Sequence, residues 1–259
     1  MRILSIKRRA VKVVFFLVAL AALQIVFFEF FLKSGKVAEV QDLAHIERAA
    51  LSQTSLNFEN VDLKYLSGRV IAIDPGHGGV DNGAGAFGRK EKDLNLKIAV
   101  KLAAELRQNN ATVILTRAED LDYYTRGKGG KRNDLLKRSE IIETSGAEVF
   151  VSIHCNSTYN SSWVGAQVFY NAAVAENREL AEIIQQSLKN FPVGNKRQAK
   201  QDSNIFLLKS TKVPGVLVEA GFMSNRKEAR SLSEEEYQKS IAASIVKALA
   251  YYFGRNEMR

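Results

Sequence analysis

The chain is poor in cysteine and histidine and carries no internal repeat or low-complexity tract. Its 259 residues include one cysteine, Cys155, and three histidines. A single cysteine excludes an intramolecular disulfide, so a hydrophobic core must hold the fold together. Hydrophobic residues make up 46% of the chain, which suffices for such a core and argues against disorder over the main body. The length suits one domain with additional segments.

The charge balance is basic, with a formal net charge of +9. A basic surface suits anionic partners such as wall polymers, phospholipid headgroups or nucleic acid. No basic-aromatic stripe or nucleic-acid motif is present, so we expect no nucleic-acid partner. A simpler interpretation of the excess charge is solubility combined with orientation in a membrane.

Residues 13–32 form an almost wholly apolar run that follows five basic residues: Arg2, Lys7, Arg8, Arg9 and Lys12. About 20 residues at ~1.5 Å per residue cross a hydrocarbon core of ~30 Å, so a transmembrane helix is predicted. The preceding cations keep the N-terminus in the cytoplasm. A cleaved signal peptide is the alternative, although no A-x-A site follows the run. A buried core helix is a third interpretation.

Three segments are predicted from this pattern: a cytoplasmic basic segment and anchor or signal at 1–33, a connector at 34–66 and a catalytic domain at 67–259. With a retained anchor, the domain lies at the extracytoplasmic face of the cytoplasmic membrane. With a cleaved signal, it is exported to the wall. The connector has apolar residues at helical spacing, which predicts a short amphipathic helix containing Val37, Val40, Leu43, Ile46 and Ala50.

The body alternates between β-branched runs and amphipathic stretches. Strands are predicted at 70–73, 112–116, 149–153, 166–170, 205–208 and 216–218, and helices at 93–109, 134–145, 175–190 and 233–253. This alternation predicts an α/β domain with a mostly parallel central sheet and helices on both faces. The polar stretches 75–92, 117–133 and 193–204 are long loops, which in compact domains are usually functional or mobile.

Reactive residues gather where predicted strands end. His77 follows the first strand, His154 ends the strand at 149–153, and Glu219 ends the strand at 216–218. Ligands of open α/β sheets bind beyond the carboxyl ends of the strands, so these side chains mark the expected site. The third histidine, His45, falls in the connector.

Each of these residues also has a plain structural interpretation. His77 lies between glycines, where a histidine often serves only in a turn. Asp74 either accepts a hydrogen bond from the imidazole or caps the turn. Alternation along the strand turns His154 and Cys155 to opposite faces, which excludes them as a nucleophilic pair and favours a core position for the cysteine. Glu219 is either paired with an arginine or acts as a general base.

A catalytic zinc typically has three protein ligands and one open position, so two histidines require a third ligand. The first loop offers Asp81, Glu91 and Asp93. Asp93 is the natural N-cap of the helix predicted at 93–109. Spacing alone does not decide whether Glu91 is a metal ligand or only a carboxylate in the first helical turn, where the helix dipole favours it.

Taken together, several segments resemble the zinc-dependent N-acetylmuramoyl-L-alanine amidases, the amidase-3 family of peptidoglycan hydrolases. They are IDPGHGG (73–79), EKDLNL (91–96), TR (116–117), VSIHCN (151–156) and VLVEAGFMSN (216–225). These segments occur in the family's order, and the resemblance covers about residues 68–254. Residues 163–170, 175–177 and 196–208 also resemble the sporulation-associated branch called CwlD, which implies work on spore cortex peptidoglycan.

The resemblance implies that His77, Glu91 and His154 bind Zn²⁺ and that Glu219 is the catalytic carboxylate. It implies cleavage of the amide between N-acetylmuramic acid and L-alanine in peptidoglycan. Further substrate or supporting contacts are expected from Asp74, Asn156, Arg138, Lys200 and Arg226. The competing hypotheses are a metal hydrolase of another bond, a non-catalytic wall-binding module and a structural membrane protein. A regulatory partner protein is left open.

Overall fold

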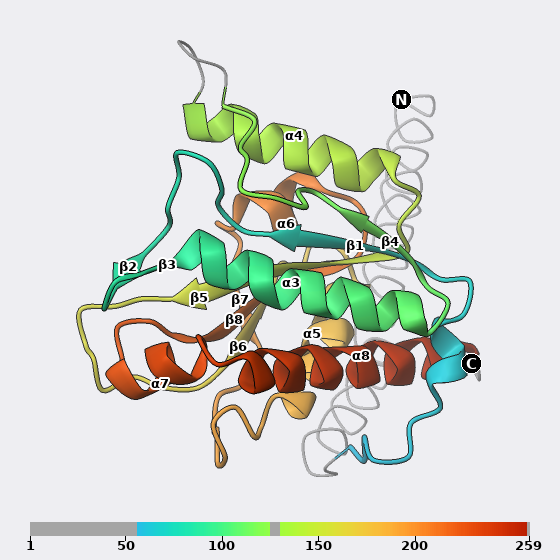
Figure 1. Cartoon of the computed structure of the whole chain (residues 1–259). Helices are drawn as coiled ribbons and strands as arrows, with labels where there is room; N and C mark the ends of the chain where they lie inside the picture. The colour runs from blue at the N-terminus through green and yellow to red at the C-terminus, as the bar shows by residue number, and fades with distance from the viewer. Residues whose placement is uncertain (1–55, 125–129, 258–259) are drawn as a thin grey trace, which may run out of the picture. The chain divides into compact units, whose positions relative to one another are not determined.

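A six-stranded sheet lies at the centre of the computed structural model, which describes residues 56–124 and 130–257 (Figure 1). Its spatial order is β4-β1-β5-β8-β6-β7. The strands are β1 (Val70–Pro75), β4 (Thr112–Leu115), β5 (Val149–Asn156), β6 (Gln167–Tyr170), β7 (Lys200–Gln201) and β8 (Gly215–Phe222). All neighbours run parallel except β6 and β8, which are antiparallel. The predicted mostly parallel sheet is therefore confirmed.

Helices cover both faces of this sheet, as expected. They are α3 (Glu91–Gln108), α4 (Gly130–Thr144), α5 (Glu176–Ser187), α6 (Phe206–Ser210), α7 (Arg226–Ser231) and α8 (Glu235–Glu257), with a 3₁₀ turn η1 (Leu63–Leu66). One core contains side chains from α3, α5 and α8 packed against Ile73, Val151 and Val218. A second core contains side chains from α4 and α6 packed against Phe150 and Leu217. Alternate residues of each strand thus enter different cores.

Helix α3 begins two residues earlier than predicted, because hydrogen bonds to the preceding loop fix its first turn. The helix begins at Glu91, and its N-cap residue, Lys90, makes no side-chain capping bond. Instead, the Glu91 and Lys92 amides donate to the Ala84 and Asn82 carbonyls at 2.9 and 3.2 Å. The preceding loop thereby satisfies the first N–H groups that a cap would otherwise take. The predicted cap at Asp93 is wrong, because this residue already lies inside the helix.

Two local assignments change in the structure. The strand predicted at 205–208 is the start of the short helix α6, because a four-residue apolar run does not distinguish a buried strand from a buried helix. The loop predicted at 75–92 contains a hairpin of β2 (Gly85–Ala86) and β3 (Arg89–Lys90). Phe87 and Gly88 form its two-residue turn with positive φ angles of 51° and 74°, as a type I′ turn requires.

The described part of the predicted connector packs onto the domain. Leu66 is fully buried, and Leu56 and Phe58 are among the partly buried residues around the larger core. Within residues 56–124 and 130–257, no helix has the length and apolar character needed to cross a membrane. The span predicted at 13–32 and the amphipathic helix predicted at 37–50 lie outside the described residues.

Candidate metal centre and active site

Three parallel strands end at the same edge of the sheet and place the reactive residues there. His77 lies in the loop after β1, His154 is near the end of β5, and Glu219 lies in β8. The register pairs His154 directly with Glu219. Because side chains of paired residues point to the same face, the imidazole and the carboxylate are neighbours. The sheet itself therefore brings together groups that are 65 residues apart in the sequence.

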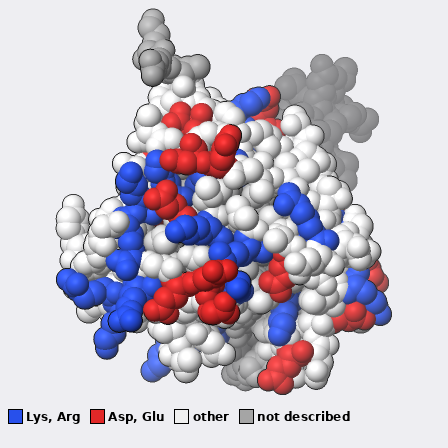
Figure 2. All heavy atoms as spheres, viewed as in Figure 1, with Lys and Arg blue, Asp and Glu red and all other residues white. Residues whose placement is uncertain are grey.

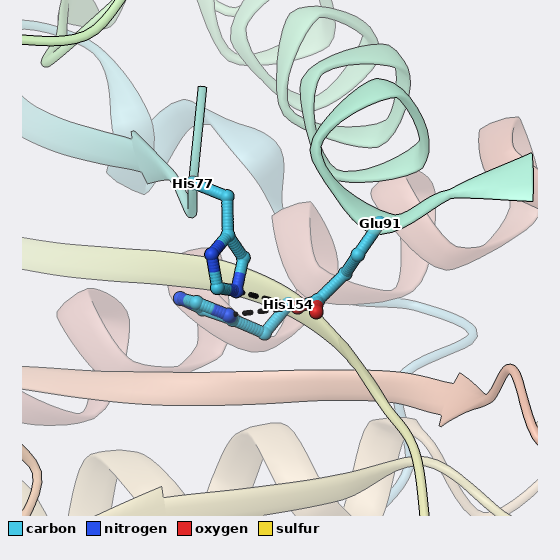
Figure 3. A group of neighbouring side chains, drawn as sticks. All are labelled: His77, Glu91 and His154. Atoms are coloured by element: carbon cyan, nitrogen blue, oxygen red, sulfur yellow. Dashed lines mark hydrogen bonds and ion pairs between the residues drawn. The ribbon is translucent and has the colours of Figure 1, made fainter. Parts of the chain in front are cut away.

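His77, Glu91 and His154 point toward one another (Figure 3). Glu91 Oε1 lies 3.2 Å from His77 Nε2 and 3.0 Å from His154 Nδ1. One ligand atom from each residue lies within 4.8 Å of the others. Tetrahedral zinc with bonds of about 2.1 Å separates its ligand atoms by roughly 3.4 Å. Two imidazoles and a carboxylate at this spacing fit a catalytic zinc site.

Glu91 is held by the backbone around it. Its Oε2 accepts a hydrogen bond from the Ala84 amide at 2.8 Å, and its Oε1 accepts one from the Cys155 amide at 3.2 Å. Burial raises the pKa of Glu91, but the hydrogen bonds and charges of His154 and His77 outweigh burial and hold this pKa well below its usual range. The carboxyl group is therefore ionised and offers a negative charge to a cation.

His77 is oriented by Asp81, which sequence reasoning considered only as a ligand. Asp81 Oδ2 lies 2.8 Å from His77 Nδ1, on the side of the ring opposite the nitrogen that faces Glu91. A carboxylate in this place fixes the tautomer of a metal-binding imidazole. Burial raises the pKa of Asp81, but His77 and the Gly83 amide dominate and lower it to about 2. The imidazole contact that is one of the two interpretations of Asp74 is thus made by Asp81.

The backbone approaches His154 closely at Gly76. A Cβ atom added at Gly76 would lie 2.1 Å from His154 Nε2, so only glycine fits beside this ring. The next residue, His77, has a φ of 60°, which is uncommon for any residue other than glycine. An unusual backbone of this kind persists only where surrounding contacts impose it.

Two buried arginines impose that backbone. Arg138 donates to the carbonyls of Pro75 and His77 at 2.7 and 2.6 Å. Arg117 donates to the carbonyls of Pro75 and Gly76 at 2.8 and 3.0 Å. Three successive carbonyls are thus held by two guanidinium groups, which fixes the position of the His77 loop.

Among the predicted supporting or substrate residues, Asp74 and Arg138 lie in the interior of the domain. They are 2% and 1% exposed and form a buried ion pair at 2.8 Å. Asp74 also accepts hydrogen bonds from Thr116 and Ser152, both at 2.6 Å. Burial raises the pKa of Asp74, but Arg138 and these hydroxyl groups lower it to about 2. The pair is a buried support beneath the loop.

The Glu219 carboxylate at this edge has one oxygen that forms no hydrogen bond with any described residue. Its Oε2 is buried without a hydrogen-bond partner. Burial raises the pKa of Glu219 to about 7, with a smaller lowering by His154 and a raising by Glu91. A buried oxygen without a partner is costly and calls for an explanation. A group with a pKa near neutrality is also suited to proton transfer.

Comparison with known proteins agrees with this geometry. The family model described as N-acetylmuramoyl-L-alanine amidase (amidase-3) matches residues 71–251. This chain belongs to the N-acetylmuramoyl-L-alanine amidase family. The chain is 40% identical over 192 residues to the germination-specific N-acetylmuramoyl-L-alanine amidase of Bacillus subtilis (strain 168), and the match covers 73% of this chain and 81% of the relative.

Solved amidases have the same fold. The CwlD amidase from Clostridioides difficile, solved in complex with the GerS lipoprotein, is 38% identical with a TM-score of 0.68, covering 73% of this chain and 100% of that one. An N-acetylmuramoyl-L-alanine amidase from Clostridium difficile 630 is 31% identical with a TM-score of 0.65, covering 73% and 98%. These similarities confirm the family and the CwlD-type resemblance.

The remaining predicted contacts of this amidase are scattered. Asn156 ends β5, and its carbonyl accepts a hydrogen bond from the Met223 amide at 2.7 Å. Lys200 lies on β7, separated from β8 by β6, with its ammonium 5.8 Å from the Phe169 ring centre. Arg226 begins α7 and is exposed. The structure therefore does not place Lys200 beside the metal-ligand group.

Sequence reasoning missed α7 although a signal for it was present. Asn225 is followed three residues later by Glu228, which is a helix-start pattern. The Asn225 side chain accepts hydrogen bonds from the amides of Lys227 and Glu228. The Glu228 carboxylate does not return to the cap. It accepts hydrogen bonds from the amides of Gly165 and Phe222 at 2.9 and 2.8 Å and so ties the loop after β5 to β8.

Proposed function

We propose that this amidase hydrolyses the bond between the lactyl carboxyl of N-acetylmuramic acid and the L-alanine of the stem peptide at a zinc site. The proposed zinc ligands are His77, Glu91 and His154, and the proposed proton-transfer group is Glu219. The observation that carries the proposal is the buried, unpartnered Oε2 of Glu219, in a side chain paired in register with His154.

The three ligands suit the cation in charge and in number. Two imidazoles and one carboxylate leave a fourth position open, as in other catalytic zinc sites. Zinc at such a site lowers the pKa of water and polarises the scissile carbonyl. Asp81 keeps the first imidazole in the tautomer that presents Nε2 toward Glu91. The arginine contacts described above keep the loop of His77 in place.

Glu219 is proposed to move the proton that the reaction requires. As a carboxylate it takes a proton from the attacking water, and as a carboxylic acid it delivers this proton to the leaving amine of L-alanine. Burial raises the pKa of Glu219 above its usual value, which makes the protonated form easier to reach in the transfer. Its partner-free oxygen requires no other hydrogen bond to break before the transfer.

The names of the relatives support a proposal for the setting in which this amidase acts. Their names include a germination-specific amidase and a CwlD amidase solved with a lipoprotein. We infer that this amidase acts outside the cytoplasmic membrane on spore cortex or cell-wall peptidoglycan, with residues 13–32 as its anchor or export signal. A protein partner of the lipoprotein kind is part of this proposal.

Product analysis tests the chemistry. The full-length chain is incubated with purified peptidoglycan, with and without a zinc chelator, and mass spectrometry follows the products. We expect free stem peptides beginning with L-alanine and glycan left with bare muramic acid. Glu219→Gln is expected to lower kcat by about 10²–10⁴-fold, the usual contribution of a general acid–base group. Glu105→Gln is the matched control, because Glu105 lies on α3 away from the strand ends.

The outcomes separate the hypotheses. Loss of products with chelator and with Glu219→Gln, but not with Glu105→Gln, supports the zinc amidase. Cleavage products with a different new terminus indicate a hydrolase of another peptidoglycan bond. Zinc and wall binding without any product, even with a lipoprotein partner added, would contradict the assigned roles.

A further inference from the structure

A pocket of about 630 Å³ lies beside α7, apart from the proposed metal ligands. We name it the α7 pocket. The hairpin turn, the loop after β5 and α7 supply its main lining residues: Phe87, Ser161, Val164, Asn225, Arg226 and Lys227. None of these residues takes part in the proposed hydrolysis. The pocket combines apolar surface, hydroxyl and amide groups, two cations and one carboxylate, that of the buried Glu228, whose two oxygens accept hydrogen bonds from backbone amides.

The walls of the α7 pocket are fixed in position. Asn225 Nδ2 donates to the Ser161 carbonyl at 2.7 Å, and the Thr158 amide donates to Ser224 Oγ at 3.2 Å. Glu228 ties Gly165 to β8 through its two carboxylate oxygens. A pocket already formed in this way spares a ligand the entropy cost of ordering it.

The cations of the pocket are available to a ligand. Arg226 and Lys227 are exposed, and no carboxylate of the described residues forms an ion pair with either. By contrast, Arg230 on the same helix pairs with Glu234 at 3.5 Å. Figure 2 shows Lys and Arg side chains gathered at the lower left, where Figure 1 places α7, with Asp and Glu side chains beside them. This face of the molecule is therefore suited to an anion.

Phe87 orients the arginine of the pocket. The Arg226 guanidinium carbon lies 4.6 Å from the Phe87 ring centre, within cation–π distance. Phe87 occupies a turn position with a φ of 51°, which usually takes glycine, asparagine or aspartate, and its side chain is 42% exposed. A bulky aromatic side chain in this conformation has a steric cost, and its contact with Arg226 supplies a reason to retain it.

Two residues of the α7 pocket, Phe87 and Arg226, are close in sequence to two residues of the proposed active site, Glu91 and Glu219. Phe87 precedes Glu91 by four residues, so their separation is at most roughly 14 Å. The chain from Glu219 to Arg226 is seven residues long. An extended peptide of about four residues also spans roughly 14 Å. The length of a stem peptide is thus comparable to the largest possible separation of Phe87 and Glu91.

We propose that the α7 pocket binds the stem peptide of peptidoglycan. In this proposal, Arg226 contacts the free carboxylates of the peptide. The proposal rests on the amidase function proposed above. A guanidinium group held against a ring presents the planar donor pair that a carboxylate accepts in a bidentate manner. Phe87 and Val164 offer apolar surface to the methyl groups of alanine residues, which a purely ionic patch would lack.

Paired soluble substrates test this assignment. One is a muramoyl tripeptide with free carboxylates, and the other is the same tripeptide with its carboxylates amidated. The wild-type chain is expected to favour the free form by about tenfold in kcat/KM, as one charge-assisted contact provides. Arg226→Gln is expected to reduce this ratio to below about twofold. Arg230→Gln, the matched control on α7, is expected to keep it.

Salt provides a second readout. At about 1 M salt the Debye length is about 3 Å, so the preference of the wild-type chain is expected to weaken. Failure of the wild-type chain to cleave either substrate, even with a lipoprotein partner added, would overturn the proposed function. Cleavage of both with a ratio near one, or a ratio kept in Arg226→Gln, would overturn the pocket assignment alone. The stem-peptide assignment would also be overturned if polyphosphate bound in an Arg226-dependent manner while the two substrates were cleaved with equal kcat/KM. That result would assign the pocket to a phosphate polymer.

Discussion

The burial of Glu219 is expected to lower the free energy of unfolding when its carboxyl group is ionised, and this can be tested directly. We consider Glu219→Gln in the chelator-treated protein. The wild-type carboxyl has a pKa of about 7 in the fold, chiefly because burial disfavours its charged form, against an ordinary value of 4.5. Glutamine has nearly the same shape but carries no charge. The variant therefore removes the cost of ionising a buried group while keeping its packing.

The sign of the effect follows from proton binding. Below the unfolded pKa of 4.5, both states hold the proton and the wild-type chain keeps its full stability. As the pH rises from 4.5 to about 7, the unfolded chain releases the proton while the fold retains it, so stability falls. A difference of 2.5 between the two pKa values, at 1.36 kcal/mol each, amounts to about 3 kcal/mol above pH 7.

Urea unfolding at two pH values measures this cost. At about pH 8 we expect Glu219→Gln to exceed the wild-type chain in free energy of unfolding by about 3 kcal/mol, and at about pH 5 by about 1 kcal/mol or less. With zinc bound, the advantage is expected to shrink, because a divalent cation favours the neighbouring carboxylate. An advantage that is equal at both pH values, or a less stable variant at about pH 8, would refute the argument from burial.

Three further variants test the surroundings of the metal ligands. Asp81→Asn is expected to weaken zinc binding by about 10–100-fold in chelator competition, since it removes the carboxylate that orients an imidazole; unchanged affinity would contradict this. Arg138→Met is expected to cost about 3–5 kcal/mol in chemical denaturation, because Asp74 is left buried without its cation; a loss below about 1 kcal/mol would exclude a strong pair. Gly76→Ala is expected to keep the circular dichroism spectrum but lower zinc affinity by more than about tenfold, because its Cβ atom displaces the His154 ring; tight binding would show that the loop yields instead.

The sheet and its strand ends could be predicted because their signals are local. β-branched runs mark β1, β5 and β8, and parallel strands place their carboxyl ends at one edge. This was enough to expect His77, His154 and Glu219 near one another. Alternation along β5 also predicted correctly that Cys155 enters the core away from the imidazole of His154.

The third member of the metal-ligand group could not be fixed in the same way. Residue spacing left Glu91 undecided, because its place depends on where α3 begins, and the carbonyls of Ala84 and Asn82 set that start. Only the family resemblance favoured it. The burial of Arg138 could not be predicted from the sequence either. Its partner Asp74 is 64 residues away, and an arginine without a visible partner is expected at the surface.

The direction of β6 and the helix α6 were also beyond local patterns. A short strand has the same alternation whichever way it runs, so only pairing with β8 reveals that β6 is antiparallel. The run at 205–208 is apolar on all sides and became helical because Leu207 and Leu208 pack beside Phe150. Tertiary contacts decide such segments.

The lone cysteine provides the molecule with a native reporter. Cys155 is 1% exposed, and its amide is hydrogen-bonded to Glu91, so its thiol is shielded while the sheet edge and the carboxylate stay together. A thiol reagent therefore reacts with Cys155 only when this edge of the sheet opens, and the labelling rate measures that opening. Because the chain has no other cysteine, the signal arises from one place. Slower labelling of Cys155 on addition of zinc would show, in an unmutated protein, that the metal holds this edge closed.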